Sequence, residues 1–121
     1  MRKTIEIDGK QIEFKATGAT PLYYKQLFQR DFMKDMGKMA KMVDESGDVD
    51  YGSFENLQMI MDAAYCMAKQ ANADLDSEIE WFDQFEMFSV HAVLPEILEL
   101  WNTNQLTSIE AKKNFRLQQE K

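Results

Sequence analysis

Residues that could carry out catalysis are scarce in this sequence. It contains one histidine, His91, and one cysteine, Cys66, far apart along the chain. A hydrolase or transferase needs a nucleophile with a base beside it or paired carboxyl groups, and many nucleotide-binding enzymes need a glycine-rich loop. The sequence offers little material for the first two and has no glycine-rich phosphate loop, so we expect a protein that is not an enzyme, with no catalytic residues and no cofactor. We expect a packing or capping role for His91 and a small buried side chain for Cys66.

The acidic segment that begins at Asp44 has part of the spacing of a calcium-binding loop. The residues at positions 1, 3, 5, 7 and 12 of such a loop are Asp44, Ser46, Asp48, Asp50 and Glu55. The loop normally needs glycine at its sixth position, where the chain turns sharply. Val49 stands there, and a β-branched residue resists a positive φ angle. We therefore predict no metal site and a solvated acidic linker. A calcium-responsive helical module is the minor alternative.

Length and apolar content limit the class of protein. The chain has 121 residues, enough for one domain with its own core. No apolar run approaches the ~20 residues that span a bilayer, so we expect no membrane partner. The first ten residues lack the apolar stretch of a signal peptide, and a single cysteine fits a reducing compartment. These features together predict a cytoplasmic location.

Charge is distributed unevenly along the chain. Residues 1–43 contain nine Lys and Arg against five Asp and Glu, whereas residues 44–101 contain one against fourteen. An acidic surface repels phosphate groups, so we expect no nucleic acid partner. Contacts between unlike ends of two copies, or with a basic partner, are favoured instead. A homo-oligomer is therefore one of the expected forms.

The segment from residue 3 to residue 17 alternates apolar and polar residues, which predicts two half-buried strands. Our preferred register pairs Ile7 with Ile12 and Ile5 with Phe14 around a four-residue loop, and a two-residue Asp8-Gly9 turn is the competitor. Both registers place Ile5, Ile7, Ile12 and Phe14 on one face. Because an isolated hairpin leaves two unpaired edges, these residues mark either an assembly edge or a hairpin that only caps the core.

The remainder of the chain reads as helix. Thr20 is a predicted N-cap, and Pro21 follows it at the first helical position. We predict a single long helix from there to about Val43. Its apolar side is formed by Tyr24, Phe28, Phe32, Met36, Met39 and Val43. Ser53 caps a second predicted helix that ends at residues 71–74. Ser77 and Glu80 have the spacing of a capping box before a short segment with Trp81, and residues 89–101 form a last helix, kinked at Pro95.

These elements predict a mainly α (α+β) fold. A β-hairpin at the N-terminus is followed by three to four packed helices in a single domain, residues 1–101. Residues 102–121 form a polar tail that either extends the last helix or is flexible. Methionines recur every three residues from Met33 to Met42. Because such a repeat drifts around a helix, we expect some to lie in the core and others on a partner-binding surface.

Several segments in this order resemble the tail assembly chaperones of long-tailed phages and prophages of Gram-positive bacteria. They are the hairpin "IEIDGKQIEFKAT", the helix start "TPLYYKQLF", and "AAYCMAKQANAD", "EWFDQFE" and "ILELWNTN" before a polar tail. The likeness covers nearly the whole chain and includes no catalytic motif. It rests on the order and character of the elements, with "WFD" and "ILELW" the most specific pieces.

The resemblance implies a non-enzymatic, mostly helical protein in the host bacterial cytoplasm. Such a protein binds the tape measure protein, helps tail tube protein subunits polymerise around it, and is absent from the mature virion. Tape measure proteins are long and helical, and an amphipathic helix in an apolar groove is an economical binding mode. The candidate contacts are Met33, Met36, Met39, Leu98 and Trp101. The main alternative is a small structural tail or connector subunit that stays in the virion.

The family also commonly makes a second, longer product by programmed ribosomal frameshifting. Lys112, Lys113 and Asn114 can be encoded by codons that contain the slippery heptamer A AAA AAC. We therefore expect a slippery site there, although Lys-Lys-Asn also occurs by accident. The DNA sequence decides between the two.

Overall fold

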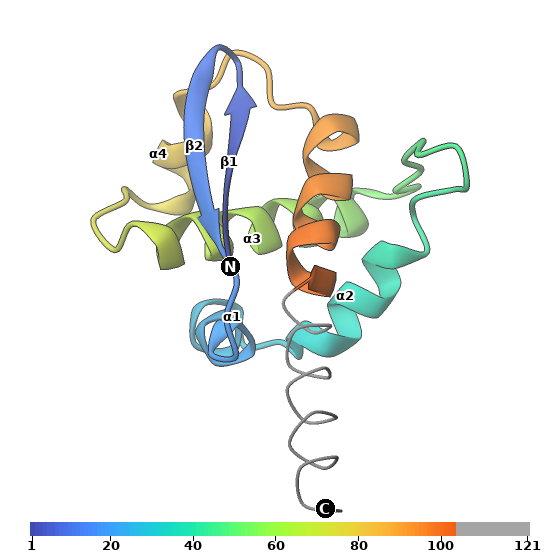
Figure 1. Cartoon of the computed structure of the whole chain (residues 1–121), viewed down its shortest axis with the longest axis horizontal. Coiled ribbons are helices and arrows are strands. Elements are labelled where there is room, and N and C mark those ends of the chain that lie inside the picture. Colours follow the sequence, from blue (N-terminus) through green and yellow to red (C-terminus); the bar gives the residue numbers. More distant parts are fainter. Residues whose placement is uncertain (104–121) are drawn as a thin grey trace, which may run out of the picture.

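The computed structural model describes residues 1–103, and in them it confirms an α+β fold with a hairpin before the helices (Figure 1). Strands β1 and β2 span Arg2–Ile7 and Lys10–Lys15. The helices are α1 (Thr20–Phe28), α2 (Phe32–Ala40), α3 (Phe54–Ala71) and α4 (Glu78–Asp83), followed by a last helix that begins at residue 90 and continues to residue 103. The described residues thus contain five helices, more than the predicted three to four.

The hairpin register differs from the one we preferred. Ile5 lies opposite Ile12 and Ile7 opposite Lys10, so the strands are joined by the two-residue turn Asp8-Gly9. Both turn residues have positive φ angles, 53° and 76°, as a tight hairpin turn with the twist of the strands requires. The four-residue loop was wrong because Asp-Gly readily adopts this turn. The apolar face is as predicted, since Ile5, Ile7 and Phe14 are buried and Ile12 is half-buried.

The single long helix predicted up to Val43 is also wrong, because the chain breaks after Phe28. Gln29 adopts a left-handed conformation with φ 60° and ψ 30°, which ends α1. Asp31 then caps α2, its side chain accepting hydrogen bonds from the backbone N–H groups of Met33 and Lys34. The apolar spacing continues across the break, so periodicity alone did not reveal it. Asp31 is the signal that could have, because aspartate favours the N-cap.

The N-caps predicted for the next two helices, Ser53 and Ser77, are confirmed. Ser53 accepts a hydrogen bond from Asn56 N–H at the start of α3, and Ser77 accepts one from Glu80 N–H at the start of α4. The cap predicted at Thr20 is wrong, since Ala19 occupies that position. The Thr20 hydroxyl instead donates to Gln70 on α3 and accepts from Thr17 N–H, so it joins α1 to the core.

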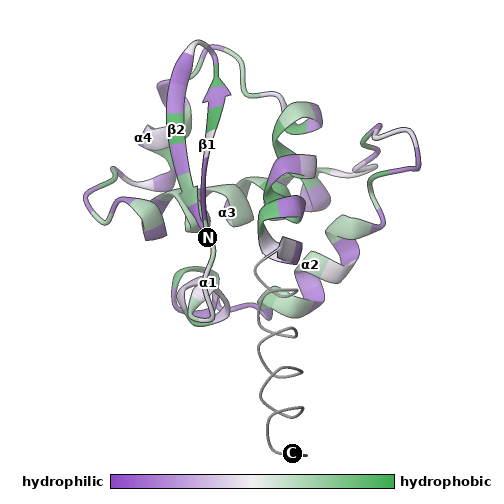
Figure 2. Cartoon of the chain, viewed as in Figure 1, coloured by the Kyte–Doolittle hydropathy of each residue, from purple (hydrophilic) through white to green (hydrophobic). Residues whose placement is uncertain are grey.

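Helix α3 is the centre of the core. Nearly all of its residues from Met59 to Ala68 are buried. A surface helix would expose one face, but this part of α3 is covered on most of its circumference. The hairpin, α1, α2 and α4 all contact it, and the largest of these contacts is with β2. Polar and apolar residues alternate along the hairpin in Figure 2, which fits one face on the core and one in solvent. Because α3 is buried on most sides, the core forms only when the hairpin and the other helices of residues 1–103 pack around it.

Predictions on residues 104–121, including the tail and the Lys112-Lys113-Asn114 segment, fall outside the described residues. The last helix is continuous from residue 90 to residue 103, with no interruption of the helical backbone at Pro95, where we predicted a kink. Among the described residues, no helix has the length and apolar character needed to cross a membrane.

A candidate protein-binding groove between α3 and α4

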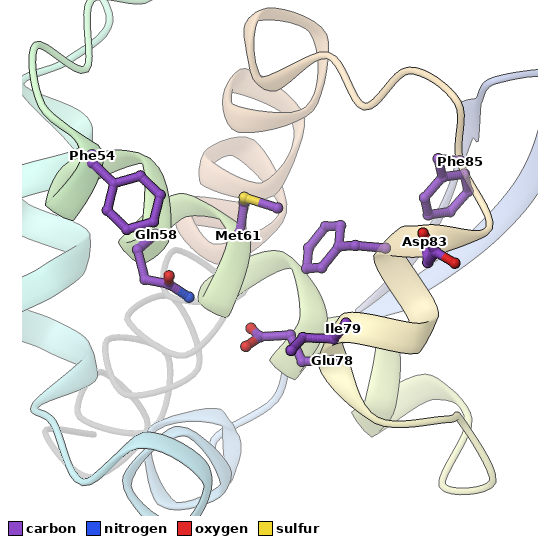
Figure 3. A pocket seen from close by; sticks show the side chains of 8 residues that line it. Phe54, Gln58, Met61, Glu78, Ile79, Asp83 and Phe85 are labelled. Carbon is purple, nitrogen blue, oxygen red and sulfur yellow. The ribbon is translucent and has the colours of Figure 1, made fainter.

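A groove of about 390 Å³ lies between the N-terminal half of α3 and α4 (Figure 3). Its apolar lining residues are Phe54, Met61, Ile79, Phe82 and Phe85, and its polar ones are Gln58, Glu78 and Asp83. Of the residues of α4, Trp81 is the one that is buried in the core, whereas Glu78, Ile79, Phe82 and Asp83 line the groove. The size and the mostly apolar lining suit side chains of another molecule.

Two large apolar side chains at the groove are exposed to solvent. Phe54 is 73% exposed and Ile79 is 81% exposed, so neither contributes its apolar area to the core. Both occupy the first turns of their helices, beyond the residues that pack on the centre of the fold. Apolar groups gathered around one groove are typical of a protein-binding site. Neither residue was among the predicted site residues. The available signal was that each is a large apolar residue in the first turn after a predicted N-cap, Ser53 or Ser77.

A second cavity of about 330 Å³ adjoins the first and shares Phe54 and Gln58 with it. Its other lining residues come from α2, α3 and the segment between α1 and α2: Arg30, Asp35, Lys38, Glu55 and Met59. The apolar groove therefore continues into a region with charges of both signs. Together the two cavities extend across α3 from α4 to α2.

A buried polar network forms the base of this second region. The Arg30 guanidinium donates to Asp62 at 2.6 Å and to Asp35 at 3.0 Å, and it also donates to the Tyr24 hydroxyl at 2.8 Å. Tyr24 in turn donates to Asp35 at 2.6 Å. Burial disfavours the charge of Arg30, but its hydrogen bonds to Asp62 and Asp35 outweigh this and keep its pKa raised. The network fixes the α1–α2 break against α3.

Glu78 joins this network from the other side of the groove. Its side chain is directed from α4 towards α3 in Figure 3, and its Oε2 atom is buried without a hydrogen-bond donor. Burial and the neighbouring Asp62 raise the pKa of Glu78 to about 8, while Arg30 opposes the shift. The raised pKa favours the protonated form near neutral pH, and as a carboxylic acid Glu78 can donate to Asp62. The acid form resolves the missing hydrogen bond.

The raised pKa of Glu78 makes stability depend on pH. Between about pH 4.5 and pH 8 the folded protein retains a proton that the unfolded chain releases, so the free energy of unfolding falls as pH rises through this window. We expect Glu78→Gln to remove this decline, which we put at about 1–2 kcal/mol because Glu78 is partly exposed. Urea unfolding at pH 5 and pH 8.5 measures it. Glu80→Gln, an exposed change on the same helix, is the control and should keep the wild-type slope.

The structure locates the five partner contacts expected from the sequence in different environments. Met36, Met39 and Trp101 are buried, with exposed fractions of 4%, 0% and 6%, which corrects their assignment to a partner-facing surface. Trp101 packs edge-on against Phe32 with ring centroids 4.9 Å apart. Met33 is exposed and Leu98 is half-buried, so these two remain accessible. The predicted apolar side of this segment already contained Met36 and Met39 but not Met33, and Met42, beyond the end of α2, is buried as well.

The hairpin residues proposed as an assembly edge have their side chains in the core, but the strand edges are a separate surface. Met1 and Ala16 exchange two backbone hydrogen bonds, of 2.8 Å and 2.9 Å. Hydrogen-bonded and non-hydrogen-bonded pairs alternate along an antiparallel ladder. The backbone N–H and C=O groups that point outward therefore belong to Arg2, Thr4 and Glu6 on β1 and to Gln11, Glu13 and Lys15 on β2.

The two edges have different neighbours. Lys3 of β1 forms ion pairs with Glu96 and Glu99, so the last helix lies along the β1 side, as Figure 1 shows. The β2 side borders a cavity of about 260 Å³ with Leu75 and Trp81 among its lining residues. The β2 edge is therefore the better place for an added strand.

The structure also locates the cysteine, the histidine and the acidic segment that the sequence analysis considered as candidate sites. Cys66 is buried as expected, and burial raises the pKa of its thiol to about 12. His91 is exposed on the last helix, with its ring 6.5 Å from that of Tyr51. In the acidic segment, Asp44 accepts hydrogen bonds from Ser46 and Asp48, and Val49 is buried opposite Val43. Within residues 1–103, no group of three or more His, Cys, Asp or Glu is arranged around a metal position.

No protein-family model, curated protein or solved structure matches this chain. Its functional assignment therefore rests on the groove and on the resemblance of the sequence.

Proposed function

We propose that this chain is a non-enzymatic tail assembly chaperone of a long-tailed phage or prophage. It binds the tape measure protein in the host cytoplasm and promotes polymerisation of the tail tube protein around it. The observation that carries the proposal is the groove between α3 and α4, with Phe54 and Ile79 mostly exposed beside it. The resemblance of the sequence supplies the identity of the partner.

The mode of binding follows from the shape and lining of the groove. An amphipathic helix of the tape measure protein lays its apolar side chains between Phe54 on α3 and Ile79 on α4. Binding covers apolar area that each protein otherwise exposes, which keeps a long helical protein soluble until tube subunits replace the chaperone. Binding of this kind includes no covalent step, so the chaperone needs no catalytic group. The resemblance implies that it leaves before the virion is complete.

Replacing the two exposed apolar residues tests the site. We expect Phe54→Asp with Ile79→Asp to reduce binding of co-expressed tape measure protein at least tenfold, because two apolar contacts become buried charges. The fold should be retained, since both side chains lie outside the core. The measurement is the soluble fraction of tape measure protein and its recovery with the tagged chain.

Leu22→Asp is the matched control for that experiment, because Leu22 is also exposed, at 67%, but lies on α1 outside the groove. Equal loss of binding in the control would move the site away from the groove. Unchanged solubility of the tape measure protein with and without this chain would contradict the chaperone function.

The outward-facing backbone groups of β2 favour a second candidate, a small structural tail or connector subunit that assembles through its hairpin. We expect Glu13→Pro to lower the mass of any assembly measured by light scattering, because proline removes an outward N–H group. Glu13→Ala removes the same side chain but keeps that N–H group, so it should assemble like the wild type. A wild type that is monomeric at high concentration and low salt rules out self-assembly. Mass spectrometry of purified virions separates the two candidates, since only the structural subunit stays in the particle.

A further inference from the structure

The wall of the groove contains a carboxyl group, Glu78, whose ionised form is not stabilised by a hydrogen-bond donor. Glu78 lines the groove, and its buried Oε2 atom has no hydrogen-bond donor in residues 1–103. Its closest charged neighbour on α3 is Asp62, which already accepts hydrogen bonds from Arg30 and Gln58. An ionised Glu78 would therefore lie beside a second carboxylate. It lacks the cation that would normally accompany it.

The other charged groups around Glu78 add to this imbalance. Asp83 lines the same groove. Burial raises the pKa of the Tyr65 hydroxyl, and the nearby carboxyl groups of Glu78 and Asp76 raise it further. No Lys or Arg is among the residues that line the groove. Arg30 is the one cation that acts on Glu78, and its hydrogen bonds are already directed to Asp35, Asp62 and Tyr24. The groove is thus apolar and acidic, without a positive charge of its own.

We propose that the groove selects a helix that carries a Lys or Arg within its apolar face, and that this cation pairs with Glu78. The inference rests on the proposed function, of which it specifies the partner's chemistry. The apolar side chains of the helix contact Phe54, Met61 and Ile79, and the cation approaches the Glu78 carboxyl group between them. A wholly apolar helix fills the same space but leaves Glu78 protonated and unpaired with any cation.

Proton release accompanies the binding of such a helix. Burial and Asp62 favour the protonated form of free Glu78 near neutral pH, and an adjacent cation favours the ionised form. Since the competent form is a minor fraction below the pKa of about 8, affinity rises with pH. We expect binding of a cationic helix to be roughly tenfold tighter at pH 8.5 than at pH 6.5. A helix without the cation should show little change.

Two synthetic peptides test the inference with the whole protein. Both are 18-residue amphipathic helices, and they differ only at the centre of the apolar face, where one has lysine and the other norleucine. Calorimetry at pH 6.5 and pH 8.5, in two buffers of different ionisation heat, gives affinity and the number of protons released. We expect tighter binding and proton release for the lysine peptide. Glu78→Gln should remove both effects, whereas Glu80→Gln should keep them.

Three results would overturn the inference: equal affinity of the two peptides, a lysine preference that persists in Glu78→Gln, or failure of both peptides to bind. Failure of the proposed function has a different signature. In that case the lysine peptide binds with proton release, but tape measure protein is neither bound nor kept soluble. Conversely, a tape measure protein that binds equally to wild type and Glu78→Gln at both pH values retains the chaperone function and removes only the cation preference.

Discussion

We expect Arg30→Met to lower the free energy of unfolding by about 3–5 kcal/mol, which is a large part of the stability of a domain of this size. Asp35 and Asp62 accept hydrogen bonds from Arg30 while their side chains are only 7% and 3% exposed. Removing the guanidinium leaves two buried carboxylates without their common cation. Methionine keeps much of the apolar stem, so the loss reflects charge and hydrogen bonds more than packing. Urea unfolding at neutral pH measures it.

Arg2→Met is the matched control, because Arg2 pairs with Glu13 on the hairpin where both side chains are about half exposed. We expect a change of less than about 1 kcal/mol there, as for other surface ion pairs. Adding Asp62→Leu to Arg30→Met should recover part of the loss, since one orphaned carboxylate is then removed. Equal effects of the Arg30 and Arg2 changes would mean that the network does not hold the α1–α2 break in place.

Trp81→Ala is expected to cost about 3–5 kcal/mol, the range for removing a large buried aromatic side chain. Trp81 is 2% exposed and connects the hairpin, α3, α4 and the segment after α4. Its ring lies 6.4 Å from Phe14, 5.8 Å from Tyr65 and 4.7 Å from Phe82. Phe85 and Phe88 are also its neighbours. Loss of the indole leaves a cavity that these rings cannot fill without moving.

Urea unfolding measures this change, and near-ultraviolet circular dichroism reports on the remaining aromatic packing. Phe54→Ala is the control, because it removes an aromatic side chain that is 73% exposed and should change stability by less than about 0.5 kcal/mol. A Trp81→Ala protein as stable as wild type would indicate that the hairpin and α4 do not share one core.

Local signals were enough to predict the strands, the apolar face of the hairpin and two helix starts. Alternation around Asp8-Gly9 marks the strands, and Ser53 and Ser77 each accept a hydrogen bond from the first turn of a helix. These features depend on residues close together in the sequence. The register could have been predicted as well, because Asp-Gly favours the two-residue turn over the longer loop.

The break after Phe28 has a local signal in the N-cap Asp31, and contacts that are distant in the sequence support it as well. Arg30 reaches Asp62 on α3, and this contact favours a turn where local periodicity favours a continuous helix. Sequence spacing alone does not contain the change of direction at this turn. Within α2, by contrast, the predicted apolar side included Met36 and Met39 and left out Met33, and the first two are buried while Met33 is exposed.

The groove could be predicted only in part. Phe54 and Ile79 are large apolar residues in the first turn after the predicted N-caps Ser53 and Ser77, and this position was the available signal. That they border one groove follows from the packing of α4 against α3, across a loop whose path is not encoded in a local motif. The state of Glu78 likewise depends on its position beside Asp62.

The buried position of Cys66 makes its thiol a natural probe of how often the core opens. The sequence has no other cysteine, and its thiol lies on α3 with 1% of the residue exposed. Alkylating and disulfide reagents react with the thiolate, which burial suppresses here by raising the pKa to about 12. Reaction therefore waits for a fluctuation that frees α3 from the elements around it. At saturating reagent the labelling rate equals the opening rate, so the lifetime of the closed core can be measured without adding a probe.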